Sequence, residues 1–218
     1  MSSAKRDLKQ AEKHLYYPST KEVAVVDIPA APFLMIDSMG DPNTALAYQQ
    51  AVEVLFSVAY TLKFLLKQEQ GMDYVVAPLE GLWWTPDMRE FSVDNKAGWH
   101  WTMMIRQPAE VTPDLFAQGV AKAQRKRDVL AALLLRLEWF HEGLAGQIMY
   151  VGPFVTEGPT IARLHAYVQE QGYALRGKHH EIYLSDPRRT APEKLRTVIR
   201  QPIELRAEMS SVCLLYTS

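Results

Sequence analysis

The chain carries an internal repeat, and this repeat limits the folds open to it more than any other feature. Ile105-Arg106-Gln107-Pro108 recurs as Ile199-Arg200-Gln201-Pro202, and a glutamate closely follows each copy, Glu110 in the first and Glu204 in the second. Hydrophobic periodicity predicts the same order of elements up to each copy, namely a strand, a helix and two strands. We therefore predict a tandem duplication of one α+β module, with the two copies related by a pseudo-twofold axis.

The predicted elements correspond between the two copies. In the first copy they lie at Phe33–Ser38, Thr44–Gln68, Tyr74–Trp84 and Gly98–Arg106. In the second copy they lie at Gly146–Val151, Pro159–Gln171, Lys178–Leu184 and Leu195–Arg200. Thr112-Pro113-Asp114 is a strong helix start, so we also expect helical structure from there to about His141, with a break near Arg127.

These elements set the expected domain organisation. We expect an N-terminal extension over residues 1–20 and one domain over 21–206. Within the domain, the elements are grouped as module one (about 21–110), linking helices (about 112–142) and module two (about 145–206). Residues 210–218 carry no charge and resemble translated vector sequence, so we expect them to be a non-native tail.

Composition excludes several classes of protein. The 218 residues are 48% hydrophobic, which is enough to form a core, and the formal net charge is −1. No overall field would therefore hold the chain on nucleic acid or on an anionic membrane. One basic run lacks a helix-turn-helix signature and interleaved aromatics, so it is interpreted as a solvated helix face rather than a nucleic-acid site: Lys122, Arg125, Lys126 and Arg127.

The cysteine count and the absence of a long apolar run indicate the compartment. The only cysteine, Cys213, excludes a disulfide framework and any site with several thiolate ligands. No window approaches the roughly 20 apolar residues that span a bilayer, and residues 1–20 do not resemble a signal peptide. We expect a soluble, cytoplasmic protein without membrane contact, and we leave a homodimer open.

Two glutamates are the leading candidates for chemistry. On a strand, Glu80 shares a face with Leu82 and Trp84, and Glu181 shares a face with Tyr183. Aligning the two modules by hand sets Glu80 beside Glu181, so the packed modules would turn both carboxylates toward one cleft. Burying a carboxylate costs several kcal/mol unless it is paired, which favours a function.

The alternative for Glu181 is structural. On this reading its carboxylate would form a salt bridge to Arg106 or Arg200 on a neighbouring strand. For Glu80 the alternative is a position at a sheet edge or bulge, because Pro78 and Gly81 lie beside it.

Four tryptophans crowd two predicted strands. Trp83 and Trp84 must face opposite sides, whereas Trp99 and Trp101 share one side. We assign Trp84 to the cleft because it shares the face of Glu80, and Trp101 because it lies nearer the middle of its strand. Packing in the core is the alternative for each of them.

Three histidines were considered as ligands. His165 lies on one helical stripe with apolar residues, so a partly buried structural histidine is the alternative to a role in binding. His179 and His180 are adjacent, so on a strand they face apart and cannot chelate one ion together. We therefore predict no metal site.

Several stretches carry a family likeness. The chain resembles the stand-alone GyrI-like small-molecule-binding proteins in collinear order from about Asp7 to Glu204, in these segments: Asp37-Ser-Met-Gly-Asp-Pro-Asn43, Pro78-Leu-Glu-Gly-Leu-Trp-Trp84, Trp101-Thr-Met-Met-Ile-Arg-Gln-Pro108, Gln147-Ile-Met-Tyr-Val-Gly-Pro153 and Gly177-Lys-His-His-Glu-Ile-Tyr-Leu-Ser-Asp-Pro-Arg189. The resemblance implies two strand-helix-strand-strand modules joined into a concave antiparallel sheet, with a ligand cleft between them.

The resemblance also implies an activity. Some stand-alone members hydrolyse the strained cyclopropane of cyclopropylpyrroloindole toxins, using glutamate and aromatic pocket residues. Carried over to this chain, those roles fall on Glu181, Glu80, Tyr183, Trp84, Trp101 and Tyr150. Tyr150 departs from the pattern, because many relatives have histidine there, and a phenol titrates near pH 10 rather than near neutrality.

The resulting hypothesis is a detoxifying protein that adds water to a strained ring in a flat, apolar small molecule, without a cofactor. Glu181, Glu80 and Tyr183 are its predicted catalytic residues, and the predicted substrate-binding residues are Trp84, Trp101, Tyr150 and His165. The alternative is a non-catalytic module that sequesters ligands or acts on DNA gyrase or transcription. Glycoside hydrolysis by paired carboxylates ranks last, because the inferred cleft has few groups that recognise sugars.

Overall fold

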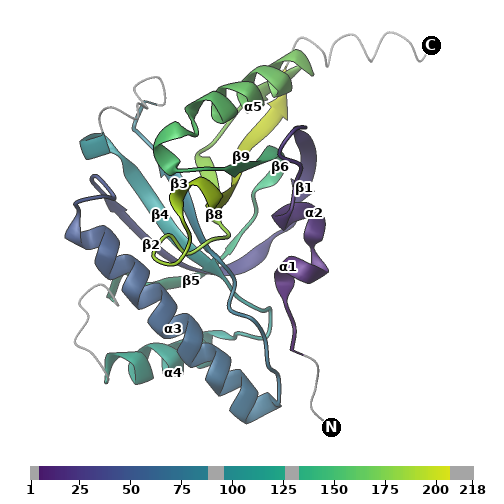
Figure 1. The fold of residues 1–218 in the computed structure, drawn as a ribbon. Helices are drawn as coiled ribbons and strands as arrows, with labels where there is room; N and C mark the ends of the chain where they lie inside the picture. Colours follow the sequence, from purple (N-terminus) through teal and green to yellow (C-terminus); the bar gives the residue numbers. More distant parts are fainter. Residues whose placement is uncertain (1–4, 88–95, 126–132, 207–218) are drawn as a thin grey trace. The chain divides into compact units, whose positions relative to one another are not determined.

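The computed structural model describes residues 5–87, 96–125 and 133–206 (Figure 1). Its contacts divide the chain into two units, and each is described by itself. Unit 1 comprises Met1–Lys13 and Ala30–His141, and unit 2 comprises His14–Pro29 and Glu142–Ser218. Both units combine helices with antiparallel strands, so the predicted α+β class is confirmed.

Unit 1 is built on an antiparallel sheet with the strand order β3-β4-β2-β5. Its strands are β2 (Ala31–Met39), β3 (Leu79–Trp84), β4 (His100–Arg106) and β5 (Arg136–Phe140). Its helices are α1 (Leu8–Ala11), α3 (Leu46–Gln70), the short η2 (Lys96–Gly98) and α4 (Pro113–Gln124).

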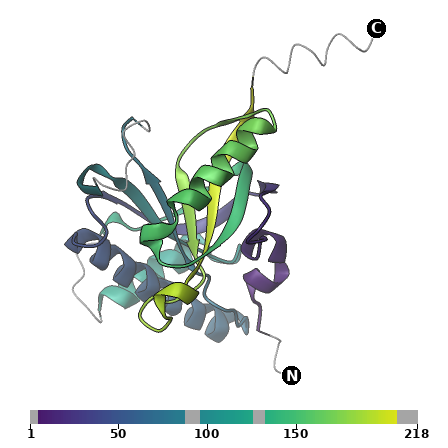
Figure 2. The same cartoon turned by 45° about the horizontal axis from the view of Figure 1, so that its top comes forward.

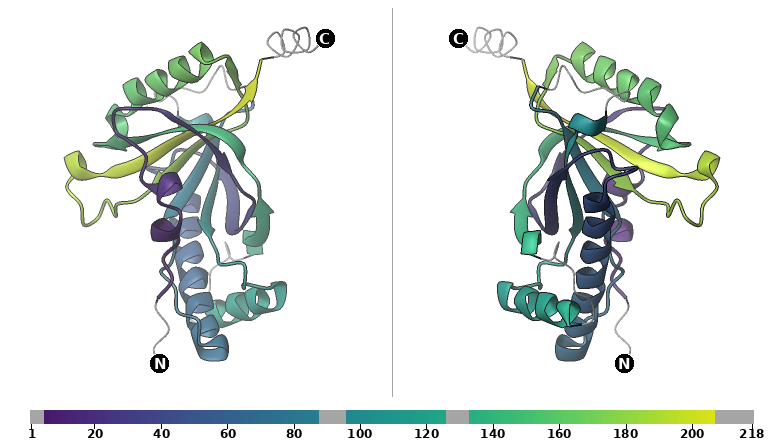
Figure 3. Two further views of the ribbon diagram at one scale, coloured as in Figure 1. Left: turned by 90° about the vertical axis from the view of Figure 1, so that its right-hand side faces the viewer. Right: turned by 90° about the vertical axis from the view of Figure 1, so that its left-hand side faces the viewer.

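Helix α3 covers one face of the unit 1 sheet, where it contacts β2 and β4, and α4 packs against α3 (Figure 3). The buried residues of α3 recur every three or four positions, which gives this helix one apolar stripe: Ala51, Val54, Leu55, Val58, Leu62 and Leu66. The helix ends at Gln70, and the φ of 67° at the next residue, Gly71, lets its N–H reach the carbonyl oxygens of the last turn.

Unit 2 is built on antiparallel strands in the order β1-β6-β9-β8, which we call the unit 2 sheet, and β7 pairs with the far end of β9. Its strands are β1 (Ala24–Ile28), β6 (Gly143–Val151), β7 (Tyr173–Leu175), β8 (His179–Tyr183) and β9 (Arg196–Leu205). Its helices are α2 (Lys13–Tyr16), η4 (Phe154–Thr156), α5 (Gly158–Glu170) and η5 (Pro192–Lys194). The first residue of α2, Lys13, belongs to unit 1.

Helix α5 lies along one face of the unit 2 sheet and contacts β6, β7 and β9 (Figure 2). Leu164 and Val168 of α5 pack with Ile148 of β6 and Ile199 of β9. On the reverse face, a second core contains Leu15 and Tyr16 of α2 and side chains of the sheet: Ile28, Ala145, Met149, Ile182 and Val198. Leu15 and Tyr16 therefore belong to the unit 2 core.

Two sequence predictions about local structure are wrong. Helical structure was expected to continue to about His141, but α4 ends at Gln124 and residues 136–140 form β5 at the edge of the unit 1 sheet. There Phe140 packs edge-to-face on Phe33, so tertiary pairing overrides the helical tendency of a leucine-rich segment. Residues 24–28 fall within the predicted range of module one, yet they form β1, which pairs with β6 in unit 2.

Some predictions fall outside the described residues. These are the tail at 210–218 with Cys213, and the last two residues of the basic run, Lys126 and Arg127. The other two residues of that run, Lys122 and Arg125, are exposed, as expected for a solvated helix face. None of the helices in the described ranges is long and apolar enough to cross a membrane.

The contact between α5 and β6 depends on a glycine. A Cβ added at Gly146 would lie 2.6 Å from Val168 Cγ1 and 3.0 Å from Leu164 Cδ1. We expect Gly146→Ala to lower the free energy of unfolding by about 1–3 kcal/mol, because the packed side chains of Val168 and Leu164 would have to shift. Gly158→Ala is the matched control, since a Cβ there meets nothing within 4 Å. Equal urea midpoints for the two variants would contradict this account.

Candidate functional site

Four of the predicted site residues lie on one face of the unit 2 sheet. This face, which we call the α5 face, is the side on which helix α5 packs. The register pairs Glu181 with Ile199, and it pairs Tyr183 and Tyr150 with Thr197 from either side. Because Ile199 and Tyr150 belong to the core beneath α5, Glu181 and Tyr183 share that side. The sequence prediction that Glu181 and Tyr183 share a face is confirmed.

Glu181 is buried and paired with a histidine. Only 9% of its side chain is exposed, and its Oε1 lies 3.1 Å from Nε2 of His179, whose side chain is 4% exposed. The two residues are next-but-one neighbours on β8, so strand alternation directs both to the α5 face. The result is a desolvated carboxylate with a hydrogen-bonding partner and a small remaining exposure.

Aromatic rings from two tyrosines and a phenylalanine lie on the same face. The ring of Tyr183 meets Phe154 of η4 edge-to-face, with 5.6 Å between the ring centroids. The Tyr150 hydroxyl donates to the Pro153 carbonyl oxygen at 2.8 Å and lies 2.6 Å from Thr156 Oγ1. The Tyr150 hydroxyl is therefore held by its own loop.

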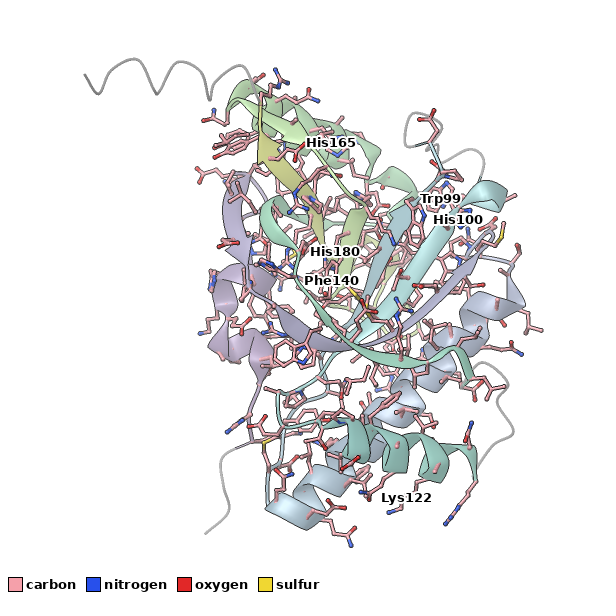
Figure 4. The ribbon with its side chains drawn as sticks, turned by 180° about the vertical axis from the view of Figure 1, so that it is seen from behind. Trp99, His100, Lys122, Phe140, His165 and His180 are labelled. Atoms are coloured by element: carbon pink, nitrogen blue, oxygen red, sulfur yellow. The ribbon has the colours of Figure 1, made fainter. Side chains whose placement is uncertain are left out.

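His165 reaches the α5 face from the helix (Figure 4). Burial lowers the pKa of His165, the nearby His179 lowers it further, and a hydrogen bond with the Gln201 side chain acts in the opposite direction. The neutral imidazole is therefore favoured, and among the described residues its buried Nε2 has no hydrogen-bond partner. His165 is partly buried, as the structural alternative expected, and its role in binding stays a prediction.

The reverse face of the unit 2 sheet carries a separate polar network. Glu142 accepts from His180 Nδ1 at 2.8 Å and from Arg200 at 3.3 Å. Arg200 also donates to the Leu15 carbonyl oxygen at 2.7 Å and to Gln147 Oε1 at 3.0 Å. Burial alone would raise the pKa of Glu142, but His180 and Arg200 outweigh it and hold this pKa below its ordinary value. We call this group the Arg200 network.

The structural alternative for Glu181 is therefore wrong. Arg200 pairs opposite His180, on the face away from Glu181, and its carboxylate partner is Glu142. Arg106, in the other copy of the repeat, forms a bidentate pair with Glu12 at 2.5 and 2.9 Å. His179 and His180 face apart as predicted, one toward Glu181 and the other toward Glu142.

In unit 1, Glu80 lies on the sheet face opposite α3. It pairs with Met104, which packs with Leu82 and, at the margin of the cluster, Trp84. The predicted grouping of Glu80, Leu82 and Trp84 on one face is thus confirmed. Glu80 is only 2% exposed, and Trp84 stacks on His100 with 5.7 Å between ring centroids. A catalytic role for Glu80 stays a prediction.

The two tryptophans assigned to ligand binding lie on opposite faces of the unit 1 sheet. Trp101 pairs with Trp83 beneath α3, where Tyr48 contacts both rings. Trp101 is fully buried, and its indole N–H donates to the Gly40 carbonyl oxygen at 3.3 Å. Trp84 pairs with His100, the residue before Trp101, so the side chains of Trp84 and Trp101 point to opposite faces of the sheet. The prediction that both line one cleft on this sheet is therefore wrong.

The register also corrects the hand alignment of the two modules. Leu79 pairs with Ile105 in β4, and Glu181 pairs with Ile199, its counterpart in the repeat. The structural counterpart of Glu181 is therefore Leu79, one residue before Glu80. Arg106 lies on the face away from α3, and Arg200 lies on the face away from α5, so the repeated arginines occupy equivalent positions. Glu80 and Glu181 do not. The prediction that Glu80 and Glu181 serve one ligand stays a prediction.

A family model now gives this arrangement a context. The model of the GyrI-like small molecule binding domain matches residues 21–204. The chain belongs to this family. The family prediction is confirmed, and this GyrI-like protein carries a small-molecule-binding domain.

Solved structures from Listeria innocua resemble this GyrI-like protein over their whole length. An uncharacterized conserved protein is 37% identical with a TM-score of 0.86, and two proteins named hydrolases are 35% and 36% identical with TM-scores of 0.80 and 0.82. Each comparison covers 92% of this chain and 100% of the other. Among curated proteins, none matches this chain significantly.

Sequence reasoning missed three residues of the α5 face. His179 was considered only as a metal ligand, although alternation alone places it on the face of Glu181. Thr197 and Phe154 gave no signal, because their positions depend on the register of β9 and on the turn after β6. Within the described ranges, no group of three His, Cys, Asp or Glu side chains is arranged to hold a metal ion.

Proposed function

We propose that this GyrI-like protein binds a flat, apolar xenobiotic on the α5 face and adds water to a strained electrophilic ring, such as the cyclopropane of cyclopropylpyrroloindole toxins. The observation that carries the proposal is the Glu181 carboxylate, 9% exposed and 3.1 Å from His179, beside the ring of Tyr183. A buried carboxylate aligned by a histidine is suited to take a proton from water. The two similar Listeria proteins named hydrolases support the assignment.

Five side chains of the α5 face have distinct parts in this proposal. Glu181 orients a water molecule and accepts its proton, and His179 positions the carboxylate through its hydrogen bond. The rings of Tyr183 and Phe154 hold the flat body of the ligand, and His165 contributes an uncharged imidazole. Stacking contributes about 0.5–1.5 kcal/mol per good aromatic contact beyond burial.

The bond changes balance without a cofactor. The water oxygen forms a bond to a ring carbon, and one carbon–carbon bond of the cyclopropane breaks. Its electron pair moves into the conjugated system and ends as an oxyanion, while the proton of water passes to Glu181. Tyr183 stabilises the oxyanion by a hydrogen bond, because the hydroxyl of Tyr150 is already committed to Pro153. The proton held by Glu181 finally passes to the oxyanion, which leaves Glu181 ionised again.

Turnover distinguishes this enzyme from a module that only sequesters its ligand. Limiting protein incubated with excess cyclopropane-bearing toxin is expected to yield more than one equivalent of ring-opened, hydrated product by mass spectrometry. The product formed in water enriched in ¹⁸O should carry the label, since water supplies the new oxygen. Bound but unchanged toxin at stoichiometric capture would overturn the enzymatic proposal in favour of sequestration.

The remaining predicted residues are tested in the same assay. Glu80→Gln tests whether Glu80 assists Glu181, and a lower kcat is the expected result. Glu80 lies on the sheet face away from the helix of its unit, whereas Glu181 lies on the face that α5 covers. Trp84→Leu tests the binding role of the half-buried tryptophan through the dissociation constant of the toxin. Unchanged values in both variants would restrict the site to the α5 face.

A further inference from the structure

One buried hydroxyl on the α5 face lacks a partner. Thr197 is 1% exposed, and its Oγ1 has no hydrogen-bond partner among the described residues. Burying a hydroxyl without a hydrogen bond is unfavourable, and native proteins seldom retain such a group. A valine has the same shape and would avoid this cost. The threonine therefore calls for an explanation other than packing.

The position of Thr197 beside the proposed catalytic groups offers an explanation for its hydroxyl. Thr197 lies directly opposite Tyr183 on β8 and directly opposite Tyr150 on β6. Glu181 pairs with Ile199, two residues further along β9, so Thr197 and Glu181 are diagonal neighbours on one face. Diagonal neighbours of this kind lie about 7–8 Å apart at their Cα atoms, a span that one water molecule can bridge between two side chains.

We propose that Thr197 holds the attacking water against Glu181, so that the hydroxyl gains its hydrogen bond only when the site is in use. This inference rests on the proposed function and adds a second anchoring point for the nucleophile. One carboxylate oxygen alone leaves a water free to pivot, whereas a second hydrogen bond fixes the direction of its lone pair. The Tyr150 hydroxyl cannot take this part, because it is bonded to Pro153 and Thr156.

The test compares Thr197→Val, which keeps the shape, with Thr197→Ser, which keeps the hydroxyl. Thr197→Val is expected to lower kcat for ring hydration by about 10²-fold with little change in the dissociation constant of the toxin. Thr197→Ser should retain most of kcat. Because the hydroxyl has no partner in the free protein, Thr197→Val should also unfold at a Tm equal to or above that of the wild type.

Each other result overturns the inference in an identifiable way. An unchanged kcat in Thr197→Val removes the hydroxyl from the reaction, and a weaker dissociation constant with an unchanged kcat assigns it to ligand binding instead. A clearly lower Tm in Thr197→Val with the wild-type Tm in Thr197→Ser assigns the hydroxyl to the fold. If the wild type itself gives no turnover, the proposed function fails, and a weaker dissociation constant of the toxin in Thr197→Val then assigns the hydroxyl to ligand binding without catalysis.

Discussion

Glu181→Gln is expected to lower kcat for ring hydration by about 10²–10⁴-fold, the usual contribution of a positioned general base. Glutamine keeps the shape of the side chain and can still accept a hydrogen bond from His179, which lies 3.1 Å from Oε1 in the native protein. It cannot take a proton from water. We therefore expect the dissociation constant of the toxin and the free energy of unfolding to change little.

A matched control separates the loss of a base from a general effect of charge. Glu204→Gln removes one carboxylate from β9 of the same sheet at an exposed position, so its turnover should equal that of the wild type. Turnover rates are measured at saturating toxin, and folding is followed by urea titration. Full activity in Glu181→Gln would exclude this carboxylate as the base, and a large loss of stability would assign it to the fold.

Arg200→Met is expected to lower the free energy of unfolding by about 3–5 kcal/mol, because it leaves the buried Glu142 without one of its compensating charges. In the Arg200 network the guanidinium bonds to Glu142, to Gln147 and to the Leu15 carbonyl oxygen. Its side chain is 4% exposed and that of Glu142 is 1% exposed, so solvent screens the pair little. Urea titration measures the loss directly.

Two further variants show whether the loss comes from the buried charge. Arg188→Met removes an arginine whose side chain is 84% exposed and which pairs with Asp186, so solvent screens this pair and the urea midpoint should stay close to that of the wild type. Combining Arg200→Met with Glu142→Leu should recover part of the loss, because no carboxylate then remains buried beside a missing cation. If the double variant lost more free energy of unfolding than the two single variants lose together, this electrostatic origin would be refuted.

Strand alternation was sufficient to predict much of the site within each strand. It grouped Glu181 with Tyr183 and Glu80 with Leu82, and it separated His179 from His180. These predictions need only a period of two along one strand. They hold because both strands are regular over the residues concerned.

The relation between strands could not be predicted in the same way. Hand alignment of the modules missed by one residue, and a shift of one residue exchanges the faces of a strand. The register of β3 against β4 and of β8 against β9 therefore decides that Leu79, and not Glu80, corresponds to Glu181. The same register brings Thr197 next to Tyr183, which no local pattern indicates.

Long-range partners were the other limit of sequence reasoning. The repeat motif drew attention to Arg106 and Arg200, but their carboxylate partners, Glu12 and Glu142, lie far from them in the sequence. The leucine-rich segment before Phe140 has helical composition, and only its pairing with β2 makes residues 136–140 a strand. Burial of ionic pairs and edge pairing are properties of the assembled units, so neither leaves a signal in a short window.

The placement of β1 in unit 2 has a consequence for how this chain is made. During synthesis β1 leaves the ribosome long before β6, the strand on which it docks, and the whole of residues 30–141 is translated in between. Leu15 and Tyr16 likewise reach their packing partners only after the strands of unit 2 have been translated. The two units can therefore not complete their folding one after the other, and a gene cut after residue 141 would yield a C-terminal product in which the edge of β6 lacks its partner strand.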